Sequence, residues 1–254
     1  MKWDLEYVCL SDIGRYRKNN QDNFICLGRY MHHNNRGTQE PLSGIVPVDE
    51  PRVLGIFDGM GGEDLGEMAS FIASDTIAEY PFTGEPEDEL PLWCRDANAR
   101  ICRYTDEHGV SSMGTTAAVL LFHPAAIWLC NIGDSRIFRY SGGKLKQIST
   151  DHVVQIVAGR KPALSQNLGI PETELVISPY VAHGKYIDGD VYLICSDGLT
   201  DMVKEEEIAQ ILGQNEVRTA GEILMRQALG YGGRDNTTIV VCKVVRHEKQ
   251  RAGN

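Results

Sequence analysis

The apolar residues of this chain fall into short runs that are rich in valine, isoleucine, leucine and aromatic side chains. Runs of this kind, bounded by glycine, aspartate, serine or proline, are typical of β-strands. They predict strands at residues 6–11, 22–27, 52–58, 115–122, 126–132, 136–141, 191–196 and 237–245. The links at 122–125 and 132–135 are short, so both predict antiparallel hairpins.

Apolar residues at helical spacing occur in other segments, at 64–80, 93–108, 204–212 and 217–229. At the start of the first segment, Asp64 and Glu67 have the spacing of a capping box. Glycine follows each of the last three segments, as expected of C-terminal stop signals, at Gly109, Gly213 and Gly230.

The order of these elements favours an α+β layered fold over a parallel βαβ fold, because strands pair locally and helices occur in separate blocks. No repeat or low-complexity linker divides the chain, so we expect residues 1–254 to form a single domain. The polar segment 29–51 is longer than an ordinary connection and predicts a loop that is functional or flexible. The acidic stretch 85–89 predicts a solvated turn before the second helix.

Composition narrows the class of protein. The chain has 254 residues, of which 42% are hydrophobic and 24% charged, as in an ordinary globular protein. No apolar run approaches the roughly 20 residues of a membrane-spanning helix, and the acidic N-terminus does not match a secretory leader. The net charge of −10 argues against a nucleic-acid-binding surface. The seven cysteines lack zinc-like spacing and predict buried, reduced thiols in a cytoplasmic protein.

Several aspartates adjoin glycine where an apolar run ends, which is where a strand gives way to a turn. Asp58, Asp134 and Asp197 have this context, and Asp235 precedes the last predicted strand. Such carboxylates, gathered at one rim, would form an oxygen-only site for hard divalent cations. Metal-assisted hydrolysis is therefore the leading hypothesis from the residues themselves.

The glycine-rich segment after Asp58 permits close backbone approach, so the Asp58 carboxylate and the Gly59 carbonyl can face one ion. A dinucleotide fingerprint does not fit, because Asp64 takes the place of its third glycine, and no Gly-Lys-Ser/Thr follows for a P-loop. The remaining alternative is a tight strand-to-helix turn with a solvated aspartate.

Asp197 and Asp201 are spaced to share one face of a helical turn, where two carboxylates repel unless a cation lies between them. The alternative is a helix start with an acid in its first turn. A nucleophilic serine at Ser135 does not fit, because the elbow motif needs glycine where Ile137 stands.

The set and order of motifs resemble the metal-dependent serine/threonine protein phosphatases of type 2C, in their compact bacterial form. The matching motifs are RKNNQD at 17–22, DGMGG at 58–62, MGTT at 113–116, GDSR at 133–136, TDH at 150–152, SDGL at 196–199 and DNTT at 235–238. The resemblance as a whole covers the chain from about residue 5 to residue 245. The resemblance implies a four-layer α-β-β-α sandwich of two antiparallel sheets flanked by helices.

The resemblance also implies a metal site with two core ions, Mn²⁺ or Mg²⁺. Asp58 would bridge the ions, the Gly59 carbonyl would complete the shell of one, and Asp197 and Asp235 would bind the other. Paired divalent ions can acidify a shared water, and the resulting hydroxide would attack phosphorus directly. No cysteine nucleophile is then required.

Further positions follow from the same resemblance. Asp134 and Asp201, together with Asp197, match a weaker third ion site, and Arg17 would bind the phosphate through its planar guanidinium. Asp22 and Gln21 are candidates beside the metal ligands.

The chain also departs from the family pattern. Gln21 stands where the family has a glutamate that hydrogen-bonds metal-bound water, which predicts lower metal affinity. Met60 replaces the histidine of eukaryotic members, so water would protonate the leaving group. The flap region, residues 152–169, is shortened, and we expect the long 29–51 loop to replace it in part in contacting the substrate.

The resulting expectation is an enzyme that hydrolyses phosphoserine and phosphothreonine in proteins. Its partners would be phosphorylated proteins, with a cognate serine/threonine kinase and its substrates, and neither nucleic acid nor membrane. One alternative is a weak or inactive relative that binds phosphoproteins as a regulatory module. Another is a hydrolase of small phosphoesters.

Overall fold

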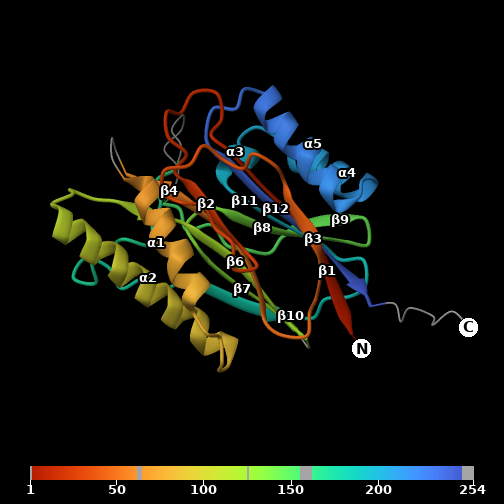
Figure 1. Ribbon diagram of the computed structural model, residues 1–254, viewed down its shortest axis with the longest axis horizontal. Helices are drawn as coiled ribbons and strands as arrows, with labels where there is room; N and C mark the ends of the chain where they lie inside the picture. The colour runs from red at the N-terminus through yellow and green to blue at the C-terminus, as the bar shows by residue number, and fades with distance from the viewer. Residues whose placement is uncertain (1, 62–64, 125, 155–161, 248–254) are drawn as a thin grey trace, which may run out of the picture.

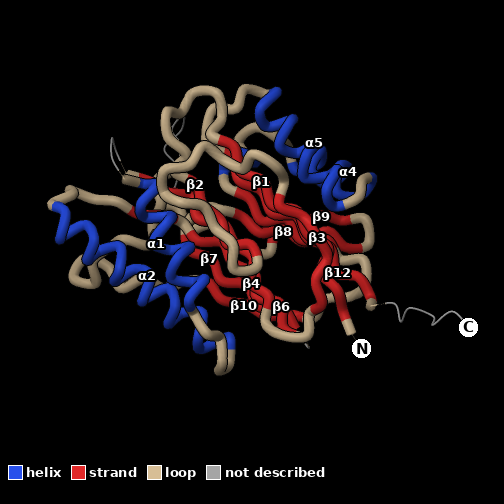
Figure 2. The backbone as a smooth tube through the Cα atoms, in the orientation of Figure 1, coloured by secondary structure: helices blue, strands red, loops and turns tan. Residues whose placement is uncertain are grey.

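The structure, a computed structural model, describes residues 2–61, 65–124, 126–154 and 162–247. Two β-sheets pack face to face, and helices cover the outer face of each sheet (Figure 1, Figure 2). The predicted α+β class and its four-layer α-β-β-α order are confirmed.

The first sheet has the strand order β3-β1-β12-β11-β8-β9, and each neighbouring pair is antiparallel. Its long central pair is β1 with β12, which runs in register from Trp3 opposite Arg246 to Asp12 opposite Thr237. The strands are β1 (Trp3–Asp12), β3 (Leu42–Pro47), β8 (Arg136–Ser141), β9 (Lys144–Gln147), β11 (Val191–Cys195) and β12 (Thr237–Arg246).

The second sheet has the order β10-β7-β6-β4-β2 and is also antiparallel. A two-residue strand, β5, extends it by pairing with the end of β4. The strands are β2 (Asp22–Cys26), β4 (Arg52–Met60), β5 (Gly114–Thr115), β6 (Ala117–His123), β7 (Ala126–Ile132) and β10 (Tyr180–Gly184).

The helices cover the two outer faces unequally. Two helices lie on the second sheet, and a short helix and two longer ones lie on the first (Figure 1). They are α1 (Gly66–Glu79), α2 (Pro86–His108), α3 (Asp197–Thr200), α4 (Glu205–Gln214) and α5 (Val217–Gly230). Among the described residues, no helix has the length and apolar character needed to cross a bilayer.

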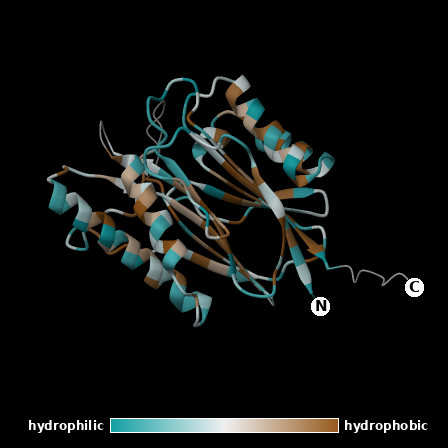
Figure 3. Cartoon of the chain, in the orientation of Figure 1, coloured by the Kyte–Doolittle hydropathy of each residue, from teal (hydrophilic) through white to brown (hydrophobic). Residues whose placement is uncertain are grey.

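Three apolar layers hold these elements together, one between the sheets and one beneath each group of helices. Side chains alternate between layers along a strand. In β1, Leu5 and Cys9 face the other sheet, whereas Val8 and Leu10 face the helices. Because central strands are buried on both faces, they are apolar almost throughout, and Figure 3 shows hydrophobic residues concentrated along them.

All the predicted strands are present, with ends shifted by a few residues. The hairpin expected across 122–125 is confirmed, because β6 and β7 pair antiparallel. The hairpin expected across 132–135 is wrong, because β7 and β8 lie in different sheets. β8 pairs with β11 instead. All five residues of β11 are buried, in keeping with its place between two neighbouring strands.

Three short strands were not predicted. β3 lies inside 29–51, so the expectation of a loop is wrong for Leu42–Pro47, which pairs with β1. Its residues alternate between half-buried and exposed, and it contains glycine and proline. β9 and β10 are likewise short edge strands with few buried residues, and such strands leave a weak apolar pattern.

The solvated turn expected at 85–89 is wrong, because α2 already begins at Pro86. Proline is favoured at the first helical position, and acids in the first turn complement the helix dipole. Glu89 has a further role, since its Oε1 accepts hydrogen bonds from the backbone N–H groups of Thr83 at 3.1 Å and Gly84 at 2.8 Å.

Of the predicted stop glycines, Gly109 is confirmed as the C-cap of α2, with φ 64°. Gly213 and Gly230 lie inside α4 and α5 and have no left-handed φ, so they are not caps. In the capping box expected before α1, Asp64 lies outside the described residues. The residue before the helix is Leu65, which has φ 83° and no side-chain cap.

Candidate active site

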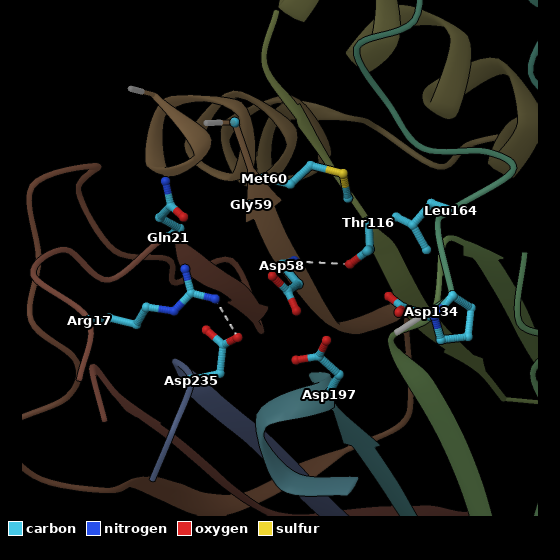
Figure 4. Close-up of a pocket in the computed structure, with 12 residues that line it drawn as sticks. Arg17, Gln21, Asp58, Gly59, Met60, Thr116, Asp134, Leu164, Asp197 and Asp235 are labelled. Atoms are coloured by element: carbon cyan, nitrogen blue, oxygen red, sulfur yellow. Dashed lines mark hydrogen bonds and ion pairs between the residues drawn. The ribbon is translucent and has the colours of Figure 1, made fainter. Parts of the chain in front are cut away.

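A cavity of about 290 Å³ opens at the end of the sandwich where β2 and β12 begin and β4 and β11 end. Four carboxylates from distant segments line it together with one arginine (Figure 4). Its lining comprises Arg17, Gln21, Asp58, Gly59, Met60, Gly61, Thr116, Asp134, Pro162, Leu164, Asp197 and Asp235. Antiparallel pairing brings strand starts and strand ends to the same edge, which explains this convergence.

Asp58 lies near the end of β4 and directly opposite Asp22 on β2. Asp22 is buried behind the cavity and does not line it. Its Oδ2 accepts a hydrogen bond from Ser196 Oγ at 2.8 Å, whereas its buried Oδ1 has no partner among the described residues. Asp58 therefore lines the cavity, whereas its register partner Asp22 is buried outside the cavity lining.

The surroundings of Asp58 and Asp22 disfavour the ionised form of both carboxyl groups. Burial raises the pKa of Asp58 well above its usual range, and the charges of Asp22, Asp197, Asp134 and Asp235 raise it further. Burial also raises the pKa of Asp22 to about 7, although hydrogen bonds from Thr238 and Ser196 oppose the rise. A cation among these groups would relieve both effects.

Gly59 is required by a close backbone approach. A Cβ there would lie 2.1 Å from the carbonyl oxygen of Gly66 and 2.4 Å from that of Gln21. The Gly59 N–H donates to the same Gln21 oxygen at 3.0 Å. Neither Gly59 nor Gly61 has a positive φ, so close packing at Gly59, and not an unusual φ at either residue, explains the glycine that follows Asp58.

Asp197 is the first residue of α3, two positions after the end of β11, and it lines the cavity. Asp201 is the C-cap of the same short helix and is exposed outside the cavity lining. The predicted pair therefore lies on one turn, as its spacing indicated, but only Asp197 lines the cavity, where Figure 4 shows its side chain.

Asp235 precedes β12 and forms an ion pair with Arg17, whose Nη2 lies 2.6 Å from Asp235 Oδ2 (Figure 4). The Arg17 side chain is 48% exposed, so it stands at the rim of the cavity. Its guanidinium has further N–H donors that can reach phosphoryl oxygens.

Asp134 reaches the cavity because the link after β7 crosses from one sheet to the other. His152 fixes this link by hydrogen bonding to both backbone groups of Gly133, the N–H and the carbonyl. The Gly133 N–H donates to His152 Nδ1 at 3.2 Å, and the His152 N–H donates to the Gly133 carbonyl at 2.9 Å. The link at 132–135, for which a hairpin was wrongly predicted, is thus the segment that places the Asp134 carboxylate in the cavity.

Two residues that position groups of the site, Asp58 in one case and Gln21 in the other, were missed from the sequence. Thr116 Oγ1 accepts from the Asp58 N–H at 3.0 Å and shares a hydrogen bond of 2.7 Å with Ser135 Oγ. Asn236 Oδ1 accepts from the Gln21 N–H at 2.8 Å. Both belong to motifs that carry the family resemblance, which was the available signal.

The described part of the predicted flap region, residues 152–169, contributes Pro162 and Leu164 to the cavity. Residues 152–154 and 163–165 lie side by side, since the Val154 N–H donates to the Ala163 carbonyl at 2.9 Å. No described residue of the 29–51 segment lines the cavity. The segment is held to the body instead, for example by the Tyr30 hydroxyl, which donates to Asp75 Oδ1 at 2.6 Å.

The donors around the cavity fit hard divalent cations, because they are carboxylates and a carbonyl and all are oxygen. The described residues contain no closed group of three or more histidine, cysteine, aspartate or glutamate side chains around one point. Mg²⁺ and similar ions retain several waters and need few direct protein ligands. The cavity has room for such hydrated ions.

Comparison with known proteins places the chain in a family. The family model for protein phosphatase 2C matches residues 42–230. The serine/threonine protein phosphatase PstP of Mycobacterium tuberculosis is 30% identical over 96% of this chain and 46% of its own length. The chain thus spans about half of that relative. The serine/threonine phosphatase stp of Listeria welshimeri is 28% identical over 84% of this chain and 91% of its length.

Solved structures agree with the fold. The catalytic domain of PstP, solved in complex with two manganese ions, has a TM-score of 0.78 at 29% identity and covers 96% of this chain and 100% of that one. This chain shares the two-sheet α+β sandwich, with four carboxylates and an arginine lining a cavity at one end of it. The chain belongs to the protein phosphatase 2C family.

Proposed function

We propose that this protein removes phosphate from phosphoserine and phosphothreonine in proteins, with Mn²⁺ or Mg²⁺ as its cofactor. The observation that carries this proposal is the convergence of Asp58, Asp134, Asp197 and Asp235 on one cavity with Arg17 at its rim. Family membership supports it, as does the manganese in the related PstP structure.

Two ions fit a site formed by Asp58, the Gly59 carbonyl, Asp197 and Asp235. When bound, paired divalent ions supply a nucleophilic water at neutral pH and neutralise charge on the phosphoryl group. Asp58 contributes most to holding them, because its carboxylate is surrounded by the other acids of the site. A weaker third ion at Asp134, Asp197 and Asp201 would require Asp201 to turn inward from its exposed position.

Arg17 binds the phosphoryl group. Its Nη2 holds Asp235, and the remaining guanidinium N–H groups can donate to the oxygens that gain charge during the reaction. Met60 lines the cavity and has no proton to give, so the departing serine or threonine oxygen takes its proton from water. The chain needs no cysteine nucleophile, since the cysteines it places in the two sheets are all buried.

The substrates in this proposal are phosphorylated proteins, including a cognate serine/threonine kinase and the proteins it modifies. The stp and PstP relatives are named serine/threonine phosphatases, which supports this substrate class. The reduced cysteines are consistent with a cytoplasmic location.

The test is hydrolysis of a phosphothreonine peptide by the purified chain with and without Mn²⁺. Asp58→Asn and Asp197→Asn should each lower the turnover number by more than about 100-fold. Both should leave the thermal midpoint of the metal-free protein unchanged or raised, because each removes like-charge repulsion. Asp88→Asn, an exposed acid in the first turn of α2, is the control. Near-normal turnover by either site variant would refute the proposal.

A further inference from the structure

Gln21 lies on the irregular segment before β2, and hydrogen bonds from both its backbone and its side chain hold it in place. Its backbone N–H donates to Asn236 Oδ1 at 2.8 Å, and its carbonyl accepts from the Gly59 N–H at 3.0 Å. Its side-chain amide then donates from Nε2 to Glu67 Oε2 at 3.2 Å. Three separate segments of the chain therefore fix one residue.

Glu67 belongs to the first turn of α1, and its carboxylate does not act as the expected partner in a capping box. Both of its oxygens face the segment before β2 instead. Oε1 accepts from Asn19 Nδ2 at 3.3 Å, and Oε2 accepts from Gln21 Nε2. An ionised carboxylate can only accept hydrogen bonds, so the amide group facing it must be the NH₂ of Gln21.

The consequence is that the other end of the amide, the carbonyl oxygen, is presented to the cavity. Figure 4 shows the Gln21 nitrogen directed away from Asp58 and the oxygen on the cavity side. An amide turned the other way would aim two N–H donors at a site for cations. The orientation of Gln21 therefore decides whether it assists or opposes metal binding.

The packing around Gln21 leaves its side chain little freedom. A Cβ on Gly66, the residue before Glu67, would lie 2.7 Å from Gln21 Nε2 and 2.9 Å from Gln21 Cδ. The start of α1 thus presses on the amide from the side opposite the cavity, and Glu67 is the polar group at that contact.

We propose, on the basis of the function proposed above, that Glu67 is a positioning residue for the metal site. By accepting a hydrogen bond from Gln21 Nε2, it keeps the side-chain carbonyl oxygen of Gln21 turned toward the cavity, where hydrated ions would bind. Gln21 thereby acts as a neutral acceptor, and the negative charge next to it is on α1, outside the cavity lining.

The test is Mn²⁺ binding to the purified chain by isothermal titration calorimetry, which does not depend on turnover. Glu67→Ala should weaken Mn²⁺ affinity by about 10-fold, as is usual for groups that orient metal-site residues. Glu67→Gln keeps an acceptor for Gln21 Nε2, so its affinity should stay within about 2-fold of the parent chain. Glu87→Ala removes an exposed acid from the first turn of α2 and is the control for loss of a helix-dipole partner.

A double-mutant cycle sharpens the result. If Glu67 acts through Gln21, then Glu67→Ala should add no further loss of Mn²⁺ affinity to a Gln21→Ala variant. Glu67→Met, which keeps a similar side-chain length and has only a weak acceptor, repeats the test if the alanine variant fails to fold.

The outcomes separate this inference from the proposed function. Parent-like Mn²⁺ affinity in Glu67→Ala, or equal losses in Glu67→Ala and Glu67→Gln, would overturn the positioning role. Equal losses in Glu67→Ala and Glu87→Ala would overturn it as well. Absence of phosphopeptide hydrolysis in a parent chain that binds Mn²⁺ would contradict the function instead.

Discussion

Replacing Gly59 by alanine tests whether close packing of three backbone segments builds the metal site. The new Cβ would meet two backbone oxygens, of Gly66 at 2.1 Å and of Gln21 at 2.4 Å. Neither oxygen is at the end of a flexible side chain, so relief requires β4, α1 or the segment before β2 to move by about 1 Å.

Overpacking of this kind usually costs about 1–3 kcal/mol. Because both contacts of Gly59 are with backbone atoms, we expect the free energy of unfolding to fall by about 3 kcal/mol. Any shift also displaces the backbone carbonyl groups of Gln21 and Gly59. Mn²⁺ affinity should therefore fall together with stability.

Urea unfolding of the metal-free protein measures this cost, and Gly184→Ala provides the matched control. Gly184 also lies in a strand, has no positive φ, and a Cβ there meets nothing within 4 Å. The control should be neutral or slightly stabilising. A Gly59→Ala protein as stable as the control, with unchanged Mn²⁺ affinity, would refute the reasoning.

Three further predictions concern the same cavity. The folded metal-free protein binds the Asp22 proton more tightly than the unfolded chain, whose pKa is near 3.8. Its stability should therefore fall as pH rises from about 4 to 7, and Asp22→Asn should flatten that slope in urea titrations. Leu164→Ser should raise KM for a phosphopeptide more than KM for p-nitrophenyl phosphate, because Leu164 lies on the flap side of the cavity; equal changes would contradict this. Chelation of divalent ions should lower the thermal midpoint, as the loss of a ligand at 100 times its Kd removes about 2.7 kcal/mol; an unchanged midpoint would count against a built metal site.

The strands were predictable where burial on both faces leaves a continuous apolar run, as in β6, β11 and β12. Edge strands were not, because β3 and β9 bury only part of one face and their patterns resemble loops. The partner of β8 also escaped prediction. A short link suggests a hairpin, but the choice between β7 and β11 depends on which sheet buries which face.

The acidic residues of the site were predictable as a set, because their spacing and order match a family. Their individual places were not. Asp22 and Asp201 were candidate site residues together with Asp58 and Asp197, and yet neither lines the cavity. Contacts between distant segments, such as Gln21 with Glu67 or Thr116 with Ser135, depend on the packing of backbones and have no local signature.

The central claim is that Asp58, Asp197 and Asp235 hold paired divalent ions in one cavity. Anomalous diffraction from crystals grown with Mn²⁺ tests it most directly. We predict two manganese peaks roughly 3.5–4 Å apart, both in contact with Asp58. Manganese found only elsewhere on the protein, or no manganese beside Asp58, would contradict the account.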